Sequence, residues 1–368
     1  MDSIGRGEGN FRALLRYRVH TGDSVLENHL STASKTVTYI SKTTQNELIE
    51  ICGDLIREQI ITEVKHATFF TVIGDEMTDV SKMEQFTFCL RYVFKDKVQE
   101  KFISIISAED RTGEGLARLI LEELKDLSLD PNFMIDQAYD GRSTMAGQLS
   151  GCHAYIQNLF PTVLYLHCAY SIDSNANNMS TNAAAQTLED YYRVNLFIPV
   201  LDHFIASLTD RFSAHQWLVY NVSALIPSLV EQKFFDDLRN IINFYEAYLP
   251  LLNTIKEEFQ LYRRKWVNEA PDHRPNNAID SYVCCNGTFF PNIKVLLQIY
   301  ATLPVTTATG ERSFSTLKLL KAYLRSTMSE NRLSGLAMMY IHAMINIDVK
   351  QVIDKFSKRK NRNLEFLI

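Results

Sequence analysis

The sequence predicts an α/β fold in which a core of strands and helices lies between two helical regions. Three strand patterns follow one another between residues 68 and 107, and a helix, a strand, a second helix and a fifth strand pattern follow up to residue 168. On both sides of this core, apolar residues recur at helical spacing, which indicates amphipathic helices.

The N-terminal region, residues 1–66, is predicted to be helical. Its first 44 residues are polar with a few apolar anchors, and one long amphipathic helix is expected from Gln45 to Ala67. The apolar stripe of that helix consists of Leu48, Ile51, Cys52, Leu55, Ile56, Ile60 and Val64. Such a stripe must be buried against other elements.

The core follows from residue 67 to residue 168. Thr68–Gly74 is a short continuous apolar run, as expected of a central strand. Thr112 is expected to cap a helix by accepting a hydrogen bond from the first helical turn. The remaining core elements are expected as strands at 86–92, 101–107, 132–139 and 163–168 and as a helix at about 144–158.

The sequence pattern predicts that the second half of the chain is mostly helical. Residues 169–190 lack periodicity and carry many turn formers, so a linker or a deletion junction is expected there. A loop rich in Asn and Pro is expected at 267–291, and Ser329 should begin a helix. The further divisions are a helical region at 191–290, a C-terminal helical region at 291–350 and a basic tail at 351–368.

Composition excludes several classes of protein. The 368 residues are 46% hydrophobic and 22% charged, as in an ordinary globular chain of two or three domains. No apolar run reaches the ~18 residues needed to span a bilayer, and no signal-peptide pattern is present, so a secreted or membrane protein is not expected. The net charge of −5 argues against a chain that binds polyanions as a whole. The six cysteines lack metal-site spacing and are expected to be free, buried thiols.

Two C-terminal motifs carry a resemblance to a known family. Ala308–Ser315 and Tyr323–Leu333 resemble the C-terminal dimerisation region of hAT (hobo–Activator) transposases. The similarity is to the domesticated branch that includes the zinc finger MYM-type proteins and the repressor of the inhibitor of the protein kinase. It implies a ribonuclease H-like core at 67–168, a trimmed helical insertion at 191–290 and a dimerisation region at 291–350.

Three acidic residues stand where a metal-dependent nuclease of this fold would need them. Asp75 ends the first strand, Asp140 ends the fourth strand, and Glu311 opens a C-terminal helix. Singly, each has an ordinary structural explanation as a strand end, a turn or a dipole partner. The resemblance implies that the three are the inherited catalytic and metal-binding positions, which would hold Mg²⁺ if the site were active.

Departures from the family pattern argue against strand-transfer activity. Arg142 stands two residues after Asp140, and Ser171 replaces the second histidine that follows His167-Cys168 in the family. No long helical insertion and no N-terminal zinc finger are recognisable, and Arg264-Lys265-Trp266 reads as a surface helix end. We therefore expect an inactive transposase-like protein that requires no cofactor, with a metal-dependent DNA transposase or nuclease as the alternative.

The resemblance also implies self-association. A homodimer is expected through the C-terminal region, and changing Leu317 or Leu320 to Asp should dissociate it. The residues expected to form this surface are Arg312, Phe314, Leu317, Leu320, Leu324, Leu333, Leu336 and Tyr340. Nuclear protein partners are expected, DNA binding is expected to be weakened, and the expected location is nuclear, otherwise cytoplasmic. A third hypothesis is that the chain is a truncated relic without a selected function.

Overall fold

The computed structural model describes most of the chain, in two compact units. The described residues are 9–33, 38–78, 84–139, 151–165, 187, 192–202, 205, 214–304, 312, 315–316, 319–320 and 329–359. One unit combines residues 1–59 with residues 319–368, and the other comprises residues 60–318. Except for Thr187, the predicted linker at 169–190 lies outside the described residues, as does the first part, up to residue 150, of the helix predicted at about 144–158.

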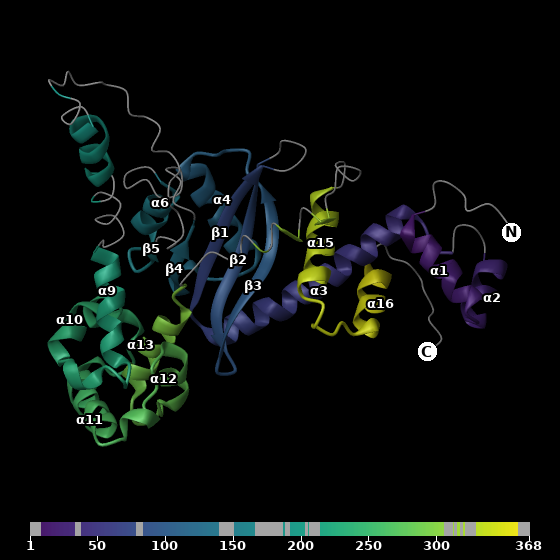
Figure 1. Cartoon of the computed structure of the whole chain (residues 1–368). Coiled ribbons are helices and arrows are strands. Elements are labelled where there is room, and N and C mark those ends of the chain that lie inside the picture. Colours follow the sequence, from purple (N-terminus) through teal and green to yellow (C-terminus); the bar gives the residue numbers. More distant parts are fainter. Residues whose placement is uncertain are drawn as a thin grey trace. The chain divides into compact units, whose positions relative to one another are not determined.

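A five-stranded sheet forms the centre of the second unit (Figure 1). Its strands are β1 (Phe70–Thr78), β2 (Glu84–Phe94), β3 (Lys97–Ser107), β4 (Met134–Ala138) and β5 (Leu164–Tyr165). Their spatial order is β3-β2-β1-β4-β5. The first three strands pair antiparallel, and β4 and β5 continue from β1 in parallel. The element order expected from the sequence is therefore confirmed.

Two helices that connect successive strands in the sequence pack on this sheet, one between β3 and β4 and the other between β4 and β5 (Figure 1). Helix α4 (Gly113–Asp126) is capped as expected, because the Thr112 hydroxyl accepts from the Gly115 N–H at 3.0 Å. Ser104 on β3 donates to Glu123 of α4 at 2.6 Å. Gln137 on β4 donates to the carbonyl of His153 in α6 (Cys152–Leu159) at 3.2 Å. These bonds tie both helices to the strands that they cover.

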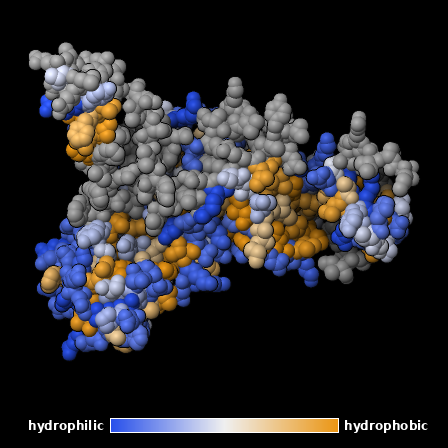
Figure 2. All heavy atoms as spheres, viewed as in Figure 1, coloured by the Kyte–Doolittle hydropathy of each residue, from blue (hydrophilic) through white to orange (hydrophobic). Residues whose placement is uncertain are grey.

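The helical lobe, residues 214–302, completes the second unit. Its helices are α9 (Ala214–Val222), α10 (Phe235–Phe244), α11 (Ile255–Val267), α12 (Ala278–Cys284) and α13 (Pro291–Thr302). Short 3₁₀ turns occur at Ser223–Leu225, Val230–Gln232, Glu246–Tyr248, Leu252–Thr254 and Pro271–His273, with a further one, Pro131–Phe133, before β4. The lobe's core is continuous with sheet residues Phe69, Ile135 and Leu164. Figure 2 shows its visible surface as mostly hydrophilic, with apolar patches.

One expectation for this lobe was wrong. The stretch at 267–291, predicted as a loop from its Asn and Pro content, contains helix α12. The reason is local, because the Asn277 side chain accepts from the Asp280 N–H at 2.9 Å and thereby caps the helix. A separate segment, residues 192–202, is helical and includes a π-helical turn at Arg193–Phe197.

The first unit is helical. It holds α1 (Asn10–His20), α2 (Ser24–Thr32), α15 (Glu330–Ile341), α16 (Val349–Lys358) and the first part of α3 (Lys42–Ala67), which continues into the second unit. Helices α3 and α15 cross at two glycines, since a Cβ at Gly53 would lie 2.9 Å from the Gly335 Cα. A Cβ at Gly335 would in turn lie 2.9 Å from the carbonyl oxygen of Ile49. Larger residues would therefore separate the two helices.

The first part of the predicted basic tail, residues 351–368, is helical. Residues up to Lys358 form α16, whose Phe356 is buried and packs edge-on against Tyr39. Lys355 pairs with Glu58 at 2.5 Å, and Arg359 pairs with Glu50 and Asp54 on α3 at 2.6 and 3.1 Å. Residues 360–368 lie outside the described residues. Among the described helices, none has both the length and the apolar run needed to cross a bilayer.

Helix α13 is held at its C-terminal end by a half-buried arginine of the sheet. The Arg91 side chain on β2, 15% exposed, donates from Nε to the Thr302 carbonyl at 3.1 Å and from Nη2 to the Ala301 carbonyl at 3.0 Å. Its Nη1 pairs with Glu100 on β3 at 2.5 Å. The Thr71 hydroxyl on β1 also donates to Thr302, at 3.1 Å. The helix-end carbonyls thus gain donors and a positive charge.

The N-terminal end of α13 is held by a carboxylate. Glu258 on α11 is buried and accepts from the Ile293 N–H at 2.8 Å and from the Asn292 amide at 2.6 Å. Asn292 also bonds both backbone groups of Leu251. Burial raises the pKa of Glu258, while the hydrogen bonds from Ile293 and Asn292 act in the opposite direction. A negative charge on Glu258 is stabilised by the positive, N-terminal end of the α13 dipole.

Replacing Arg91 by Ala should lower the free energy of unfolding by about 3 kcal/mol, because Glu100 and the carbonyls of α13 lose their partner in a buried setting. The matched control is Arg118→Ala, which breaks an exposed ion pair with Asp110. That change should cost less than about 1 kcal/mol. Urea titrations measure both, and equal losses in the two variants would contradict the assignment.

Stability should depend on pH through Glu258. Because burial raises its pKa, the folded chain holds this proton more tightly than the unfolded chain. Its contribution to the free energy of unfolding is therefore largest below its ordinary pKa and declines as pH rises through the folded pKa. We expect the stability of Glu258→Gln relative to the wild type to increase between about pH 4.5 and about pH 7.

Urea unfolding at the two pH values tests this expectation. Glu257→Gln, at an exposed neighbouring position, is the control for removing one negative charge from α11. A difference between Glu258→Gln and the wild type that stays constant over the pH range would show that Glu258 does not carry the effect.

Candidate functional site

Asp75 lies on the central strand, and the strand geometry around it is tightly constrained. It pairs with Thr87 in the antiparallel ladder between β1 and β2, and it is half-buried. The residue before it must be small, since a Cβ at Gly74 would come within 2.0 Å of the Phe86 ring. Phe86 is fully buried and packs edge-on against Tyr139, so it has little room to move. Glycine at position 74 therefore lets β1 reach Asp75 without displacing the core.

The C-terminal end of α13 lies over the sheet face to which Asp75 belongs. Side chains two apart on a strand share a face, so Asp75 lies on the same face as Thr71 and Ile73. Thr71 is bonded to the last residue of α13. The chain that leaves α13 after Leu303 therefore starts from the Asp75 face of the sheet.

Strand β4 runs beside β1 and carries a carboxylate that we did not expect. The parallel ladder pairs Thr71 with Asp136 and Ile73 with Ala138. Asp136 is fully buried. Burial, followed by the charge of Asp136, raises the pKa of Tyr245. The signal in the sequence was a charged residue in the middle of a five-residue buried strand.

Next to this strand is a thiol that remains protonated near neutral pH. Burial, assisted by the negative charge of Glu76, raises the pKa of Cys152 to about 12, against an opposing hydrogen bond with Tyr139. Beside it, His153 stacks on Tyr165 with ring centroids 4.3 Å apart. A protonated, buried thiol is a poor nucleophile. Of the other described cysteines, Cys89 and Cys285 are buried, Cys52 is half-buried and Cys284 is exposed.

The predicted triad is only partly described. Asp75 is placed, whereas Asp140 and Glu311 lie outside the described residues, as do Phe314, Leu317 and Leu324 of the predicted dimer surface. Within the described part of the chain, no group of three or more His, Cys, Asp or Glu side chains is close enough to hold a metal ion. In type, the three carboxylates of the triad suit Mg²⁺, which prefers oxygen ligands.

The other predicted dimer residues differ in exposure. Leu333 is fully buried, as are Ala337 and Met338. Leu320 and Leu336 are half-buried and Arg312 is exposed. Tyr340 is 58% exposed. Two exposed apolar residues were not predicted there, Leu319 at 71% and Met344 at 97%.

Comparison with known families finds two matches along the chain. Residues 3–151 match the family described as the ZMYM1/FAM200 RNase-like domain. Residues 258–345 match the hAT family C-terminal dimerisation region. The first match contains β1 to β4 with Asp75, and the second contains α13 and α15.

Curated relatives show the same similarity. The 52 kDa repressors of the inhibitor of the protein kinase from Homo sapiens and from Mus musculus are each 32% identical to the chain over 174 residues. Each alignment covers 47% of this chain and 23% of the relative. The chain thus spans about a quarter of the length of the curated relatives it matches.

Proposed function

The chain is a member of the hAT transposase-derived proteins, and we propose that it acts by self-association through its C-terminal region rather than by DNA strand transfer. The observation that carries this proposal is the match of residues 258–345 to the hAT dimerisation region, together with exposed apolar side chains inside it. Exposed apolar surface is typical of association sites.

The packing of α15 supports an association surface on this helix that is separate from its buried face. Leu333, Ala337 and Met338 are buried, and Gly335 approaches α3 closely. Tyr340 and Met344 remain exposed. A tyrosine with an exposed ring can supply a large contact area at low entropic cost, as residues at interface centres commonly do.

The proposal of a chain without strand-transfer activity comes from the sequence around the inherited site. Arg142 follows Asp140 by two residues, and Ser171 stands where the family has a histidine. A cation so near a carboxylate competes with a metal ion for it. We infer that the ribonuclease H-like core serves as a scaffold. We further propose a nuclear protein-binding role, in line with relatives that are named repressors.

The alternative function, metal-dependent DNA cleavage, has one structural observation in its favour. Ile73 is the last residue of β1 that pairs with β4, and its partner there is Ala138. Asp75 follows Ile73 by two positions in the sequence, and Asp140 follows Ala138 by two positions. The spacing in the sequence from the paired positions to the two carboxylates is therefore equal. Glu311 comes nine residues after Thr302, which is bonded to Thr71 on the face of Asp75.

Charging the exposed part of the C-terminal region should separate association from folding. We expect a dimer, and Tyr340→Asp should weaken it about tenfold or more without loss of helix content. Leu333→Asp should instead unfold the first unit, because it places a charge in a buried position. Val25→Asp, at an exposed position on α2 outside the matched region, should leave the dimer intact. Light scattering over a dilution series, with circular dichroism, measures these outcomes.

A monomeric wild-type chain over the whole dilution series would overturn the self-association proposal. Dissociation by Val25→Asp to the same extent as by Tyr340→Asp would show that the matched region is not the interface.

The question of activity is tested by nicking of supercoiled DNA in Mg²⁺ or Mn²⁺. We expect no nicking by the wild type, because the sequence around the inherited site departs from the family pattern at Arg142 and Ser171. Nicking that disappears in Asp75→Asn, while Asp110→Asn retains it, would instead establish the metal-dependent enzyme. Asp110 is an exposed carboxylate outside the triad that pairs with Arg118.

A further inference from the structure

A cavity of about 790 Å³ lies between α10 and α11 in the helical lobe. This volume is within the range of small-molecule sites, about 300–1,000 Å³. Phe235 and Phe259 contribute apolar surface to it, with ring centroids 6.2 Å apart, and Phe259 is buried. The cavity therefore has apolar walls that can cover part of a ligand.

Cations surround this cavity. On α11, Lys256, Arg263 and Arg264 are spaced seven and eight residues apart, which places them along one side of the helix. Lys256 and Arg264 are exposed. Lys233 and Arg239 add two positive charges from the start and the body of α10.

Few negative charges oppose these cations. Among the described residues that line the cavity, the only carboxylate is Asp236, which pairs with Arg239 at 2.6 Å. The chain as a whole carries a net charge of −5, so this local excess of cations is not a general property of the molecule. Such a local concentration of one sign attracts an anionic ligand.

An exposed aromatic ring stands at the same cavity. Phe234 is 65% exposed, and the guanidinium carbon of Arg263 lies 5.7 Å from the centroid of its ring. Arg263 is held in place by the carbonyls of Val230 and Glu231, at 3.2 and 2.9 Å. A fixed guanidinium beside an exposed ring is an arrangement on which a planar group can stack.

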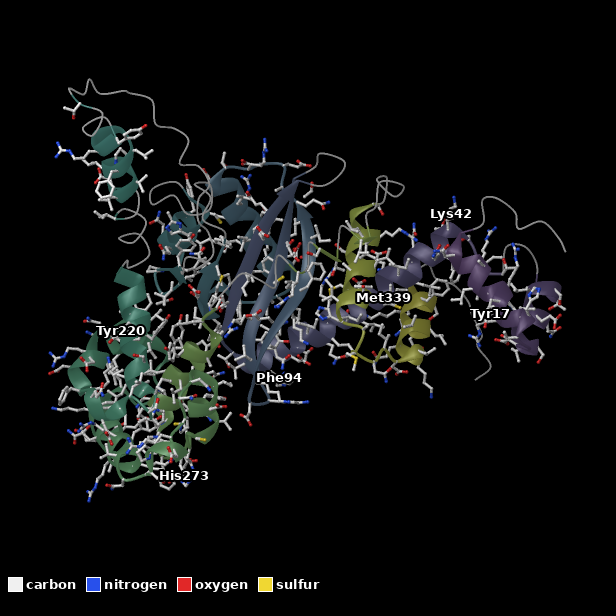
Figure 3. All side chains as sticks on the ribbon, viewed as in Figure 1. Tyr17, Lys42, Phe94, Tyr220, His273 and Met339 are labelled. Carbon is white, nitrogen blue, oxygen red and sulfur yellow. The ribbon has the colours of Figure 1, made fainter. Side chains whose placement is uncertain are left out.

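A second pair of the same kind is adjacent. The Lys233 ammonium lies 4.3 Å from the ring centroid of Tyr220, which is exposed on α9 (Figure 3). Helix α9 packs against α10, so this ring and cation belong to the same part of the lobe. Cations interleaved with exposed rings are typical of sites that bind bases and phosphates together.

We propose that this cavity binds a nucleotide unit, with its aromatic base stacked on Phe234 and its phosphates held by Lys256, Arg239 and Arg264. An acidic peptide would satisfy the cations but would leave the exposed ring unused. An apolar ligand would leave the cations without partners. A base joined to phosphates uses both features. The inference is independent of self-association and of the acidic triad.

The same chemistry can come from a free nucleotide or from a single strand of nucleic acid, and binding measurements distinguish them. Purified full-length chain is titrated with ATP by calorimetry and with a short labelled oligothymidylate by fluorescence anisotropy. Binding of ATP alone identifies a free nucleotide as the source, whereas tighter binding of the oligonucleotide identifies a strand. Either result supports the site.

Matched variants locate the binding. Phe234→Ala should lower the affinity for the ligand about tenfold or more, as expected for loss of a stacking ring. Lys256→Glu should weaken it at least as much, because it replaces an attractive charge by a repulsive one. Phe289→Ala and Lys125→Glu, at exposed positions outside the cavity, should leave affinity unchanged. All four side chains are exposed, so the thermal unfolding midpoints should stay at the wild-type value.

Three results would overturn the proposal. The first is absence of binding by both ATP and the oligonucleotide. The second is unchanged affinity in Phe234→Ala, which would indicate a patch that attracts anions without recognising a base. The third is displacement of ATP by polyglutamate as effectively as by unlabelled nucleotide, which would indicate an acidic peptide as the natural ligand.

Discussion

Helix α13 is fixed at both ends by charged side chains, and the arrangement of the second unit depends on it. Glu258 of α11 accepts hydrogen bonds at its first turn, and Arg91 of β2 donates to its last carbonyls. Each charge has the sign that the helix dipole favours at that end. Because one side chain comes from the helical lobe and the other from the sheet, separating lobe from sheet would leave buried polar groups without partners. The contacts of Glu258 and Arg91 with the two ends of α13 also fix the point on the Asp75 face of the sheet where the C-terminal region begins.

The order of strands and helices along the core could be predicted because each element carries its own signal. The central strand is a continuous apolar run, as a strand covered on both faces should be, and Thr112 marks the start of the following helix. The residues at which the strands begin and end were harder to predict. Strand β3 begins at Lys97, four residues before the predicted start, because Lys95 and Asp96 both adopt positive φ, 49° and 59°, and close a tight turn. Lys-Asp is not the Asn-Gly or Asp-Gly pair that normally announces such a turn.

Features that join distant parts of the sequence could not be predicted from local patterns. Arg91 meets Ala301 across 210 positions, and Arg359 meets Glu50 across 309. The basic residues of the cavity are scattered between Lys233 and Arg264 of an acidic chain, so no charged run marks them. Only the packing of α10 against α11 brings them together. The predicted basic tail shows the same limit, since its Lys355 and Arg359 pair with acidic residues of the distant helix α3.

The C-terminal region shows why a helical stripe alone does not distinguish a core from an interface. Leu333, Ala337 and Met338 follow the periodicity of a buried face and are buried, and Gly335 allows α3 to approach this helix. Tyr340 is part of the same helix and remains exposed. The helix that would present an association surface is therefore held by α3, a segment almost three hundred positions earlier in the chain. Residues 258–345 cannot then be treated as an independent dimerisation module, because the position of α15 depends on Ile49 and Gly53 of the N-terminal region.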